Sequence, residues 1–200
     1  MKNILITKLR DASTSRSEFR NTAHQIAYLL AAEAGSYLET TTKTIKTPIS
    51  STTGFLFKKR IILLPILRSG LILLPAFLYY FPESLVGFVG MKRDEATAKP
   101  RLYYQNLPKI ESSDQIIILD PMIATGGTAV DTISLLIKQG ITPEQILFVG
   151  VISAPEGMKV VHAAHPKVTF MVAAQDQGLT SHYFITPGLG DFGDRYFGTE

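Results

Sequence analysis

Short apolar runs alternate with amphipathic helical patterns along the middle of this chain, and no other feature of the sequence limits its fold as strongly. The runs are almost entirely apolar, so both faces of each strand must be buried, which is typical of a parallel sheet covered by helices on its two sides. Pro65 lacks a backbone donor and is expected near an edge or strand end. We expect strands at residues 61–67, 84–89, 115–119, 145–152 and 168–173, and helices at 70–80, 128–139 and 155–164. The sequence therefore predicts a Rossmann-like α/β fold, a parallel β-sheet flanked by helices.

Residues outside this alternating core are predicted to be additions to a single domain. A chain of 200 residues suits one domain and can bury about 70% of its unfolded surface. Ser15 and Glu18 fit a capping box at the start of a helix over 15–34. The polar, β-prone stretch 39–47 is typical of an exposed strand or arm. The organisation that we expect has three parts, an N-terminal helix and β-arm (1–50), an α/β core (60–173) and a C-terminal segment (174–200).

Two segments lack a helical or strand period. The first is the stretch 91–109, which we expect to be a functional lid or a disordered surface loop, because loops of this length are uncommon in compact domains. The second is the segment 174–200, which holds five of the 15 glycines. Glycine disfavours helices, so this segment is predicted to contain no helix and to be either held by specific contacts or mobile.

Composition and charge exclude several classes of protein. The absence of cysteine rules out disulfides, thiolate zinc sites and a cysteine nucleophile, and 46% hydrophobic residues are too many for a disordered chain. Charged, polar and proline residues interrupt the most apolar region, 61–81, so we expect no membrane span. The N-terminus has too short an apolar run for a signal peptide, which favours a cytoplasmic protein. A balance of 20 Lys and Arg against 17 Asp and Glu gives a net charge of +3, which suits an anionic ligand without requiring nucleic acid.

The most informative stretch is the end of the strand at 115–119 and the start of the next helix. Asp120 follows the apolar run, and Thr125-Gly126-Gly127-Thr128 opens the helix. Ligands of open α/β sheets bind at the carboxyl ends of strands. Paired glycines let backbone N–H groups converge, and a helix N-terminus favours a phosphate. The hydroxyls of Thr125 and Thr128 add donors, and Asp120 could accept hydrogen bonds from sugar hydroxyls. The alternative is a tight turn with a threonine N-cap and no ligand.

The residues 116–128 resemble the phosphoribosyl-diphosphate (PRPP) binding motif of the type I phosphoribosyltransferases. The variant Asp120-Pro121-Met122, where most members carry two adjacent acids, is similar to the uracil phosphoribosyltransferase family. The resemblance covers nearly the whole chain from about residue 13. Five further segments agree with that family in order: Pro65-Ile66-Leu67-Arg68-Ser69-Gly70, Val89-Gly90-Met91-Lys92-Arg93, Ala154-Pro155-Glu156-Gly157, Asp176-Gln177-Gly178-Leu179 and Pro187-Gly188-Leu189-Gly190-Asp191-Phe192-Gly193-Asp194-Arg195.

The resemblance implies an enzyme that transfers the phosphoribosyl group of PRPP to uracil, giving uridine monophosphate (UMP) and pyrophosphate in pyrimidine salvage. Its cofactor would be Mg²⁺, carried mainly by PRPP and still holding several waters, so no metal site of the protein's own is predicted. Arg68 and Arg93 match family positions at the diphosphate, where a guanidinium can hold two oxygens. Catalysis is expected from Arg68, Asp120 and Asp191. The residues expected to bind PRPP are Arg68, Arg93, Asp120, Pro121, Met122, Ile123, Ala124, Thr125, Gly126, Gly127, Thr128 and Asp191.

The same resemblance assigns the C-terminal segment to the base, as a hood over the sheet. Its expected uracil contacts are Ile185, Gly190, Asp191 and Phe192. Cytosine should be rejected, because its amine reverses one donor–acceptor pair. The spacing of glycines from Gly188 also fits a dinucleotide fingerprint, which fails here because only seven residues follow Gly193. The alternative is a glycine-rich tail without a ligand.

Two other functions remain open at this point. One is a regulator that retains the fold and binds RNA in response to pyrimidine nucleotides, and the other is a weak or inactive homologue that senses them. Asp120-Pro121 argues against the regulator, which usually carries adjacent acids. The basic run Lys58-Lys59-Arg60 has no interleaved aromatic residues, so we interpret it as a solvated turn and expect no nucleic-acid partner. A homodimer or higher oligomer is expected, although the arm is shorter than is usual in the family.

Overall fold

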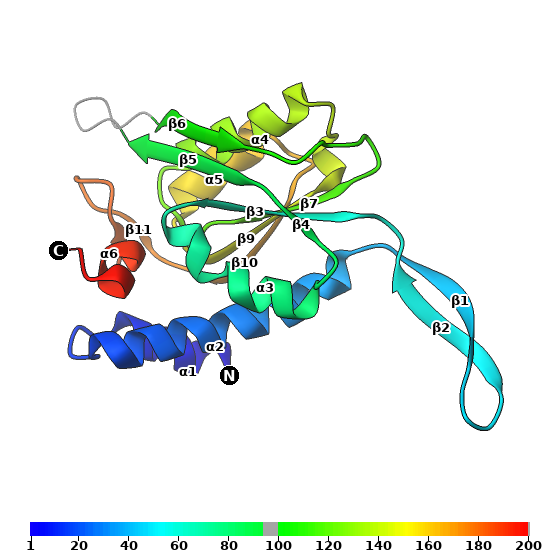
Figure 1. The fold of residues 1–200 in the computed structure, drawn as a ribbon. Coiled ribbons are helices and arrows are strands. Elements are labelled where there is room, and N and C mark those ends of the chain that lie inside the picture. The colour runs from blue at the N-terminus through cyan, green and yellow to red at the C-terminus, as the bar shows by residue number, and fades with distance from the viewer. Residues whose placement is uncertain (94–99, 200) are drawn as a thin grey trace.

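The computed structural model describes residues 1–93 and 100–199, apart from the side chains of Arg93 and Pro100. Its centre, within these residues, is an eight-stranded sheet whose main path runs β10-β9-β7-β3-β5-β6, with β4 beside β3 and β8 beside β9 (Figure 1). All pairs are parallel except β5 with β6. The strands are β3 (Ile61–Leu67), β4 (Leu85–Val86), β5 (Phe88–Arg93), β6 (Pro100–Asn106), β7 (Gln115–Leu119), β8 (Met122–Ile123), β9 (Ile146–Ser153) and β10 (Thr169–Gln175). The predicted parallel sheet is confirmed.

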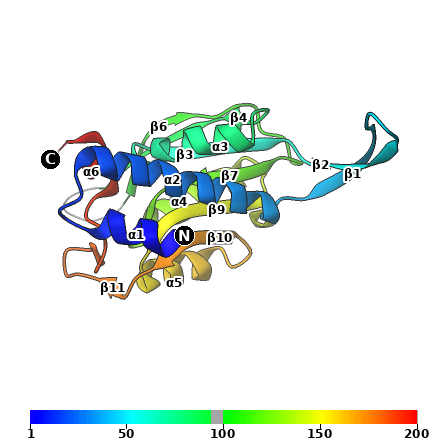
Figure 2. The same cartoon turned by 90° about the horizontal axis from the view of Figure 1, so that it is seen from below.

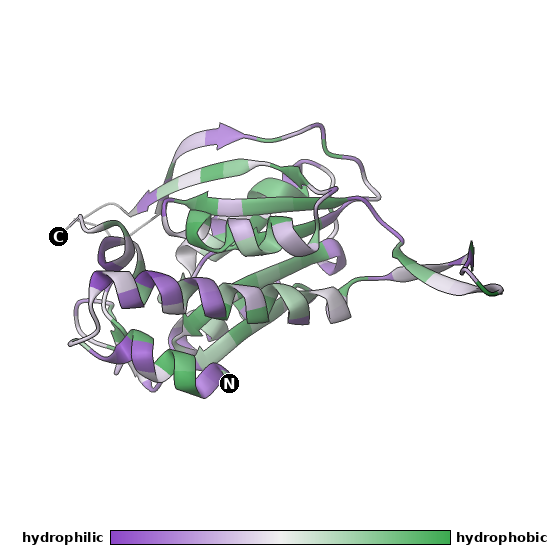
Figure 3. Cartoon of the chain, turned by 60° about the horizontal axis from the view of Figure 1, so that its bottom comes forward, coloured by the Kyte–Doolittle hydropathy of each residue, from purple (hydrophilic) through white to green (hydrophobic). Residues whose placement is uncertain are grey.

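Helices cover both faces of this sheet, as the doubly apolar strands require. Ile62 and Ile116 belong to a core shared with α4 (Gly127–Lys138) and α5 (Pro155–Ala164). Leu63 and Ile117, one position further along each strand, belong to a second core on the opposite face. That core is closed by three helices (Figures 1 and 2). They are α1 (Lys2–Arg10), α2 (Arg16–Ala34) and α3 (Leu74–Tyr80). In Figure 3 the central strands are largely hydrophobic, whereas hydrophobic and hydrophilic residues alternate along the long N-terminal helix.

β3 is an inner strand between β7 and β5, so Pro65 does not lie at an edge of the sheet. Pro65 lies between the two residues that pair with β4 and the two that pair with β5, so its missing N–H falls in a gap of that ladder. The helix expected over 70–80 begins as a 3-10 turn, η2 (Ser69–Ile72), and becomes regular at α3, with Pro75 in its first turn. A proline is tolerated there because first-turn N–H groups have no helical acceptor.

The N-terminal part contains one helix that the sequence did not predict. α1 lacks a side-chain cap, but Leu5, Ile6 and Leu9 are buried in the core. Packing of these three side chains therefore stabilises a helix that has weak local signals. α2 begins as predicted, with the Ser15 Oγ accepting from the Glu18 N–H and the Glu18 carboxylate accepting from the Ser15 N–H. It ends in a 3-10 turn, η1 (Gly35–Tyr37).

An arm extends from the body between α2 and β3 (Figure 1). It is an antiparallel hairpin of β1 (Thr40–Lys46) and β2 (Ser51–Phe57). The predicted exposed strand is confirmed, and β2 is its unpredicted partner. Ile49 is 95% exposed and Phe55 is 72% exposed, so apolar side chains of the hairpin face outward.

The prediction of an irregular loop over 91–109 is wrong for the part that the structure describes. β5 continues to Arg93, and β6 pairs with it antiparallel across a register shift at Gly90/Met91. The residues 94–99 of the expected lid lie outside the described residues. β6 has no apolar period because the side chains of residues 101–106 are all exposed, so neither face of the strand is buried.

The prediction of no helix in 174–200 is also wrong. α6 (Phe192–Phe197) is short, begins where the Asp191 carboxylate accepts from the Asp194 N–H at 2.9 Å, and ends at Gly198 with φ of 79°. Two short strands precede it, β11 (Gly178–Leu179) and β12 (Ile185–Thr186). Most of the glycines of this segment lie at turns or at the ends of helices and strands. They hide the local sequence pattern but do not prevent these short elements from forming. Among the described helices, which include η3 (Pro143–Gln145), none is long and apolar enough to cross a membrane.

Candidate active site

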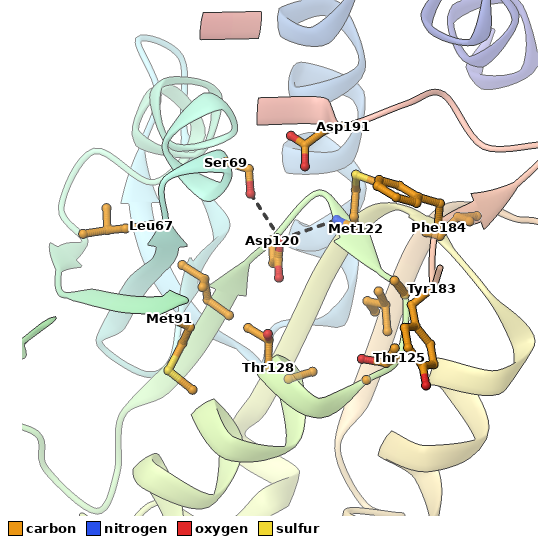
Figure 4. A pocket seen from close by; sticks show the side chains of 16 residues that line it. Leu67, Ser69, Met91, Asp120, Met122, Thr125, Thr128, Tyr183, Phe184 and Asp191 are labelled. Atoms are coloured by element: carbon orange, nitrogen blue, oxygen red, sulfur yellow. Dashed lines mark hydrogen bonds between the residues drawn. The ribbon is translucent and has the colours of Figure 1, made fainter. Parts of the chain in front are cut away.

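A cavity of about 360 Å³ lies at the carboxyl ends of β3 and β7 (Figure 4). Four separate segments line it, one of them represented by Met91 of β5 alone. Leu67 and Ser69 come from the end of β3 and the turn after it, the residues around 120–128 come from the β7–α4 connection, and Tyr183–Ile185 with Asp191 come from the C-terminal segment. This is the edge at which open parallel sheets bind ligands.

The predicted phosphate loop forms one wall of the cavity. Apart from Pro121 and Gly127, every residue of 120–128 lines it. Gly126 has a φ of 83° and precedes α4, whose first turn carries no acidic side chain. The loop packs closely on α5: a Cβ on Gly126 would lie 2.7 Å from the Gly157 carbonyl oxygen, and one on Gly157 would lie 2.2 Å from the Ala124 carbonyl oxygen. The glycine of the Pro155-Glu156-Gly157 motif therefore permits this shape of the loop.

Asp120 stands at the centre of the site, 8% exposed (Figure 4). Burial, with a smaller contribution from the nearby charge of Asp191, raises the pKa of its carboxyl to about 7. The Met122 N–H at 3.4 Å and the Ser69 hydroxyl at 3.5 Å donate to the same Oδ1 atom and oppose that rise. The carboxyl is thus poised between its two charge states near neutral pH, which is typical of functional sites.

Arg68 is placed beside the cavity, between the lining residues Leu67 and Ser69. Its side chain is 60% exposed, and its Nη2 lies 3.3 Å from the Asp194 Oδ1 of α6. The peptide bond between Leu67 and Arg68 is cis. The side chain of Arg93, the second predicted arginine, lies outside the described residues. The structure therefore brings Arg68 to the site's edge, in contact with the C-terminal segment.

The predicted base-binding residues are spread over two environments. Ile185 and Asp191 line the cavity, and Gly190 precedes Asp191 with φ of 79°. Phe192 is fully buried and its ring packs edge-on against Phe19 at 5.3 Å between centroids. The side chain of Phe192 is therefore part of the core, and its backbone is what remains for a ligand.

Sequence reasoning did not assign Tyr183 to the site, although it lines the cavity and has a φ of 64°. A turn in which the Thr180 N–H donates to the Phe184 carbonyl at 2.8 Å presents Tyr183 and Phe184 half-exposed over the loop (Figure 4). Ser69 was likewise missed as a lining residue. The presence of large aromatic residues in a polar, glycine-rich segment was the signal that could have revealed Tyr183.

Other candidate groups have ordinary partners. Lys58 and Lys59 bind Glu39 at 3.0 and 2.6 Å, and Arg60 binds Asp114 at 2.7 Å, which agrees with a surface turn. In the described ranges, 1–93 and 100–199, no group of three or more His, Asp or Glu side chains could hold a metal ion.

The fold is shared with solved phosphoribosyltransferases. A purine phosphoribosyltransferase from Pyrococcus horikoshii has a TM-score of 0.53 at 15% identity, over 76% of this chain and 81% of that one. A protein from Aquifex aeolicus, AQ2163, has a TM-score of 0.90 at 32% identity, over 100% and 95%. Fold and cavity together define a type I phosphoribosyltransferase architecture.

Sequence comparison then identifies the family. The family model described as uracil phosphoribosyltransferase matches residues 2–199. Curated uracil phosphoribosyltransferases of Malacoplasma penetrans and Dictyoglomus thermophilum are 40% and 42% identical, each over 98% of this chain and 94% of the relative. The chain belongs to the uracil phosphoribosyltransferase family.

Proposed function

We propose that this protein transfers the phosphoribosyl group of PRPP to uracil, releasing UMP and pyrophosphate. The observation that carries the proposal is that the 120–128 loop lines the same cavity as Ile185 and Asp191. A sugar phosphate on one wall and a flat base on the other would meet there. Relatives named for this activity match over nearly their full length.

On the donor side, the amides and hydroxyls from Thr125 to Thr128 would bind the 5′-phosphate at the start of α4. Asp120 would accept hydrogen bonds from the ribose hydroxyls. Arg68 and Arg93 would bind the diphosphate, on which negative charge accumulates as the glycosidic bond to the leaving group breaks. Cations fixed at that position stabilise the transition state more than the ground state.

On the acceptor side, backbone groups of Ile185 and of Gly190, Asp191 and Phe192 would read the two carbonyls and the N–H of uracil. This fits the burial of the Phe192 side chain, since a backbone reader leaves that ring free to anchor α6 in the core. Asp191 would serve both substrates, because it lies between Gly190 and Phe192 in the base-binding run and its charge acts on Asp120 of the donor wall.

Mg²⁺ would enter with PRPP and neutralise part of the diphosphate charge. Oxygen ligands suit this ion, and Asp120 and Asp191 are close enough for one charge to raise the pKa of the other carboxyl. The carboxylates of Asp120 and Asp191 both line the cavity, so they would supply oxygen ligands to the ion beside those of the substrate.

The proposed assembly is a homodimer or a higher oligomer in which the exposed apolar side chains of the β1–β2 arm are covered by a second copy. The single-domain organisation in three parts and the cytoplasmic location remain predictions from the sequence.

The deciding experiment is a turnover assay with purified protein, uracil, PRPP and Mg²⁺, with UMP followed by chromatography. Cytosine and purine bases serve as controls. We expect UMP from uracil alone among the bases tested. A folded protein that gives no product, and that binds RNA with strong salt dependence, would instead favour the regulator.

A further inference from the structure

The C-terminal segment is tied to the first helix by a buried ion pair. Asp176, which directly follows β10, has a side chain that is 1% exposed. Arg10, the last residue of α1, binds it with both ends of its guanidinium: Nη1 donates to Oδ2 at 2.7 Å and Nη2 donates to Oδ1. The pair lowers the pKa of the Asp176 carboxyl below its ordinary value, so this charge is fixed at neutral pH.

The same two side chains hold both backbone polar groups of Gly188. Its N–H donates to Asp176 Oδ2 at 2.8 Å, and its carbonyl accepts from Arg10 Nη1 at 2.8 Å. Gly188 has a φ of 65°, and a Cβ there would lie 2.1 Å from the Ile185 carbonyl oxygen. The Ile185 carbonyl therefore rests against a turn whose position Arg10 and Asp176 determine.

A second arginine, on α6, also connects the C-terminal segment to the end of α1. Arg195 of α6 donates to the carbonyls of Leu189 at 2.7 Å and of Asp11 at 2.8 Å, and also to that of Leu9. Arg195 thus links the end of α1 to Leu189, the residue after the Gly188 that Arg10 binds. Figure 1 shows α1 and the C-terminal elements on the same side of the molecule.

The contacts of Arg10 and Asp176 stabilise the base side of the cavity, and neither residue contacts the phosphate loop 120–128. The loop 120–128 is shaped by α5 through Gly157, and neither Arg10 nor Asp176 lines the cavity. We propose that Arg10 and Asp176 are positioning residues for the acceptor side, fixing the segment Ile185–Gly190 for the base, while the phosphate loop 120–128 is independent of them. The proposal rests on the proposed function and adds to it the residues that set the base site.

The test uses Arg10→Lys, with Asp176→Asn as a second variant. Lysine keeps the charge but cannot form the fork. The molecule offers a matched control in Arg60→Lys: Arg60 binds Asp114 through Nε at 2.8 Å and Nη2 at 2.7 Å, and the Asp114 side chain is fully buried. That pair lies at the opposite end of β3 and β7, away from the cavity.

We expect Arg10→Lys and Asp176→Asn to raise the KM for uracil by about tenfold, the range in which one charged hydrogen bond acts, with the KM for PRPP within about twofold of wild type. Arg60→Lys should leave the KM for uracil and the KM for PRPP near their wild-type values, even if it lowers the melting temperature as much as the other two variants do. Equal rises in both constants, or no rise beyond that of Arg60→Lys, would overturn the proposal.

Hydrogen exchange provides a reading that needs no turnover. Amides of 178–191 should exchange faster in Arg10→Lys than in Arg60→Lys, and unchanged exchange there would also overturn the proposal. An inactive wild-type protein would contradict the proposed function while leaving this measurement intact, so the two failures are distinguishable.

Discussion

Replacing Asp120 by asparagine should stabilise the free protein at alkaline pH while abolishing most of its activity. The carboxyl keeps its proton up to about pH 7 in the folded state, against 3.8 for the ordinary value that we take for the unfolded chain. The folded state therefore binds more protons between these values, and stability falls as pH rises through that window. The asparagine amide cannot ionise, so the variant escapes this loss.

The size of the effect follows from the shift. The interval from 3.8 to about 7 at about 1.4 kcal/mol per pH unit corresponds to up to about 4 kcal/mol at pH 8, and to about 1 kcal/mol at pH 4.5 where the window has only begun. Any effect of the new amide that does not depend on pH cancels in the difference between the two conditions. The pH-dependent part is then about 3 kcal/mol.

The assay is urea unfolding of wild type and Asp120→Asn at pH 4.5 and pH 8, followed by circular dichroism at equal ionic strength without substrates. The free energy of unfolding of Asp120→Asn, relative to that of wild type, should increase from pH 4.5 to pH 8. A difference in unfolding free energy between variant and wild type that is the same at both pH values, or that shifts in favour of the wild type as the pH rises, would refute the reasoning. The same variant should lose at least about 10²-fold in kcat/KM.

Three further results are expected. Arg68→Ala should lower kcat/KM by at least about 10²-fold, because it removes a cation from the diphosphate; initial rates measure this, and a near-normal value would remove Arg68 from the site. Gly126→Ala should raise the KM for PRPP and cost at least about 1 kcal/mol of unfolding free energy, because φ is 83° and the methyl group would strike the Gly157 carbonyl; an unchanged KM would contradict the role of the loop. Phe55→Ser should lower the molar mass measured by light scattering at a given concentration, with little change in the stability of the protomer. An unaltered mass would show that no second copy covers this part of the arm.

The alternating core could be predicted because its signals are local and redundant. The strand before Asp120 and the helix after Gly126 each carry their own apolar pattern, and the connection between them must reach the carboxyl edge of a parallel sheet. The loop's residues could therefore be placed at a cavity wall from the sequence alone.

The parts that could not be predicted depend on distant contacts. α1 and α6 are short, and each becomes stable by packing on residues far away in the chain, such as Phe192 against Phe19. β6 was missed because the side chains of residues 101–106 are all exposed, so the strand carries no apolar alternation. The orientation of Arg68 toward Asp194 depends on where α6 docks, which no local pattern near residue 68 encodes.

The hydrogen bonds between the end of α1 and the C-terminal segment have a consequence for synthesis of the chain. Leu9 and Arg195 are 186 positions apart, so the acceptor half of the site has very high contact order, while the phosphate loop contacts the much nearer Gly157 of α5. Chains fold from the N-terminus as they leave the ribosome, and distant pairings form late. We expect a nascent chain to acquire the donor half of its site first, and the acceptor half only when translation is almost complete.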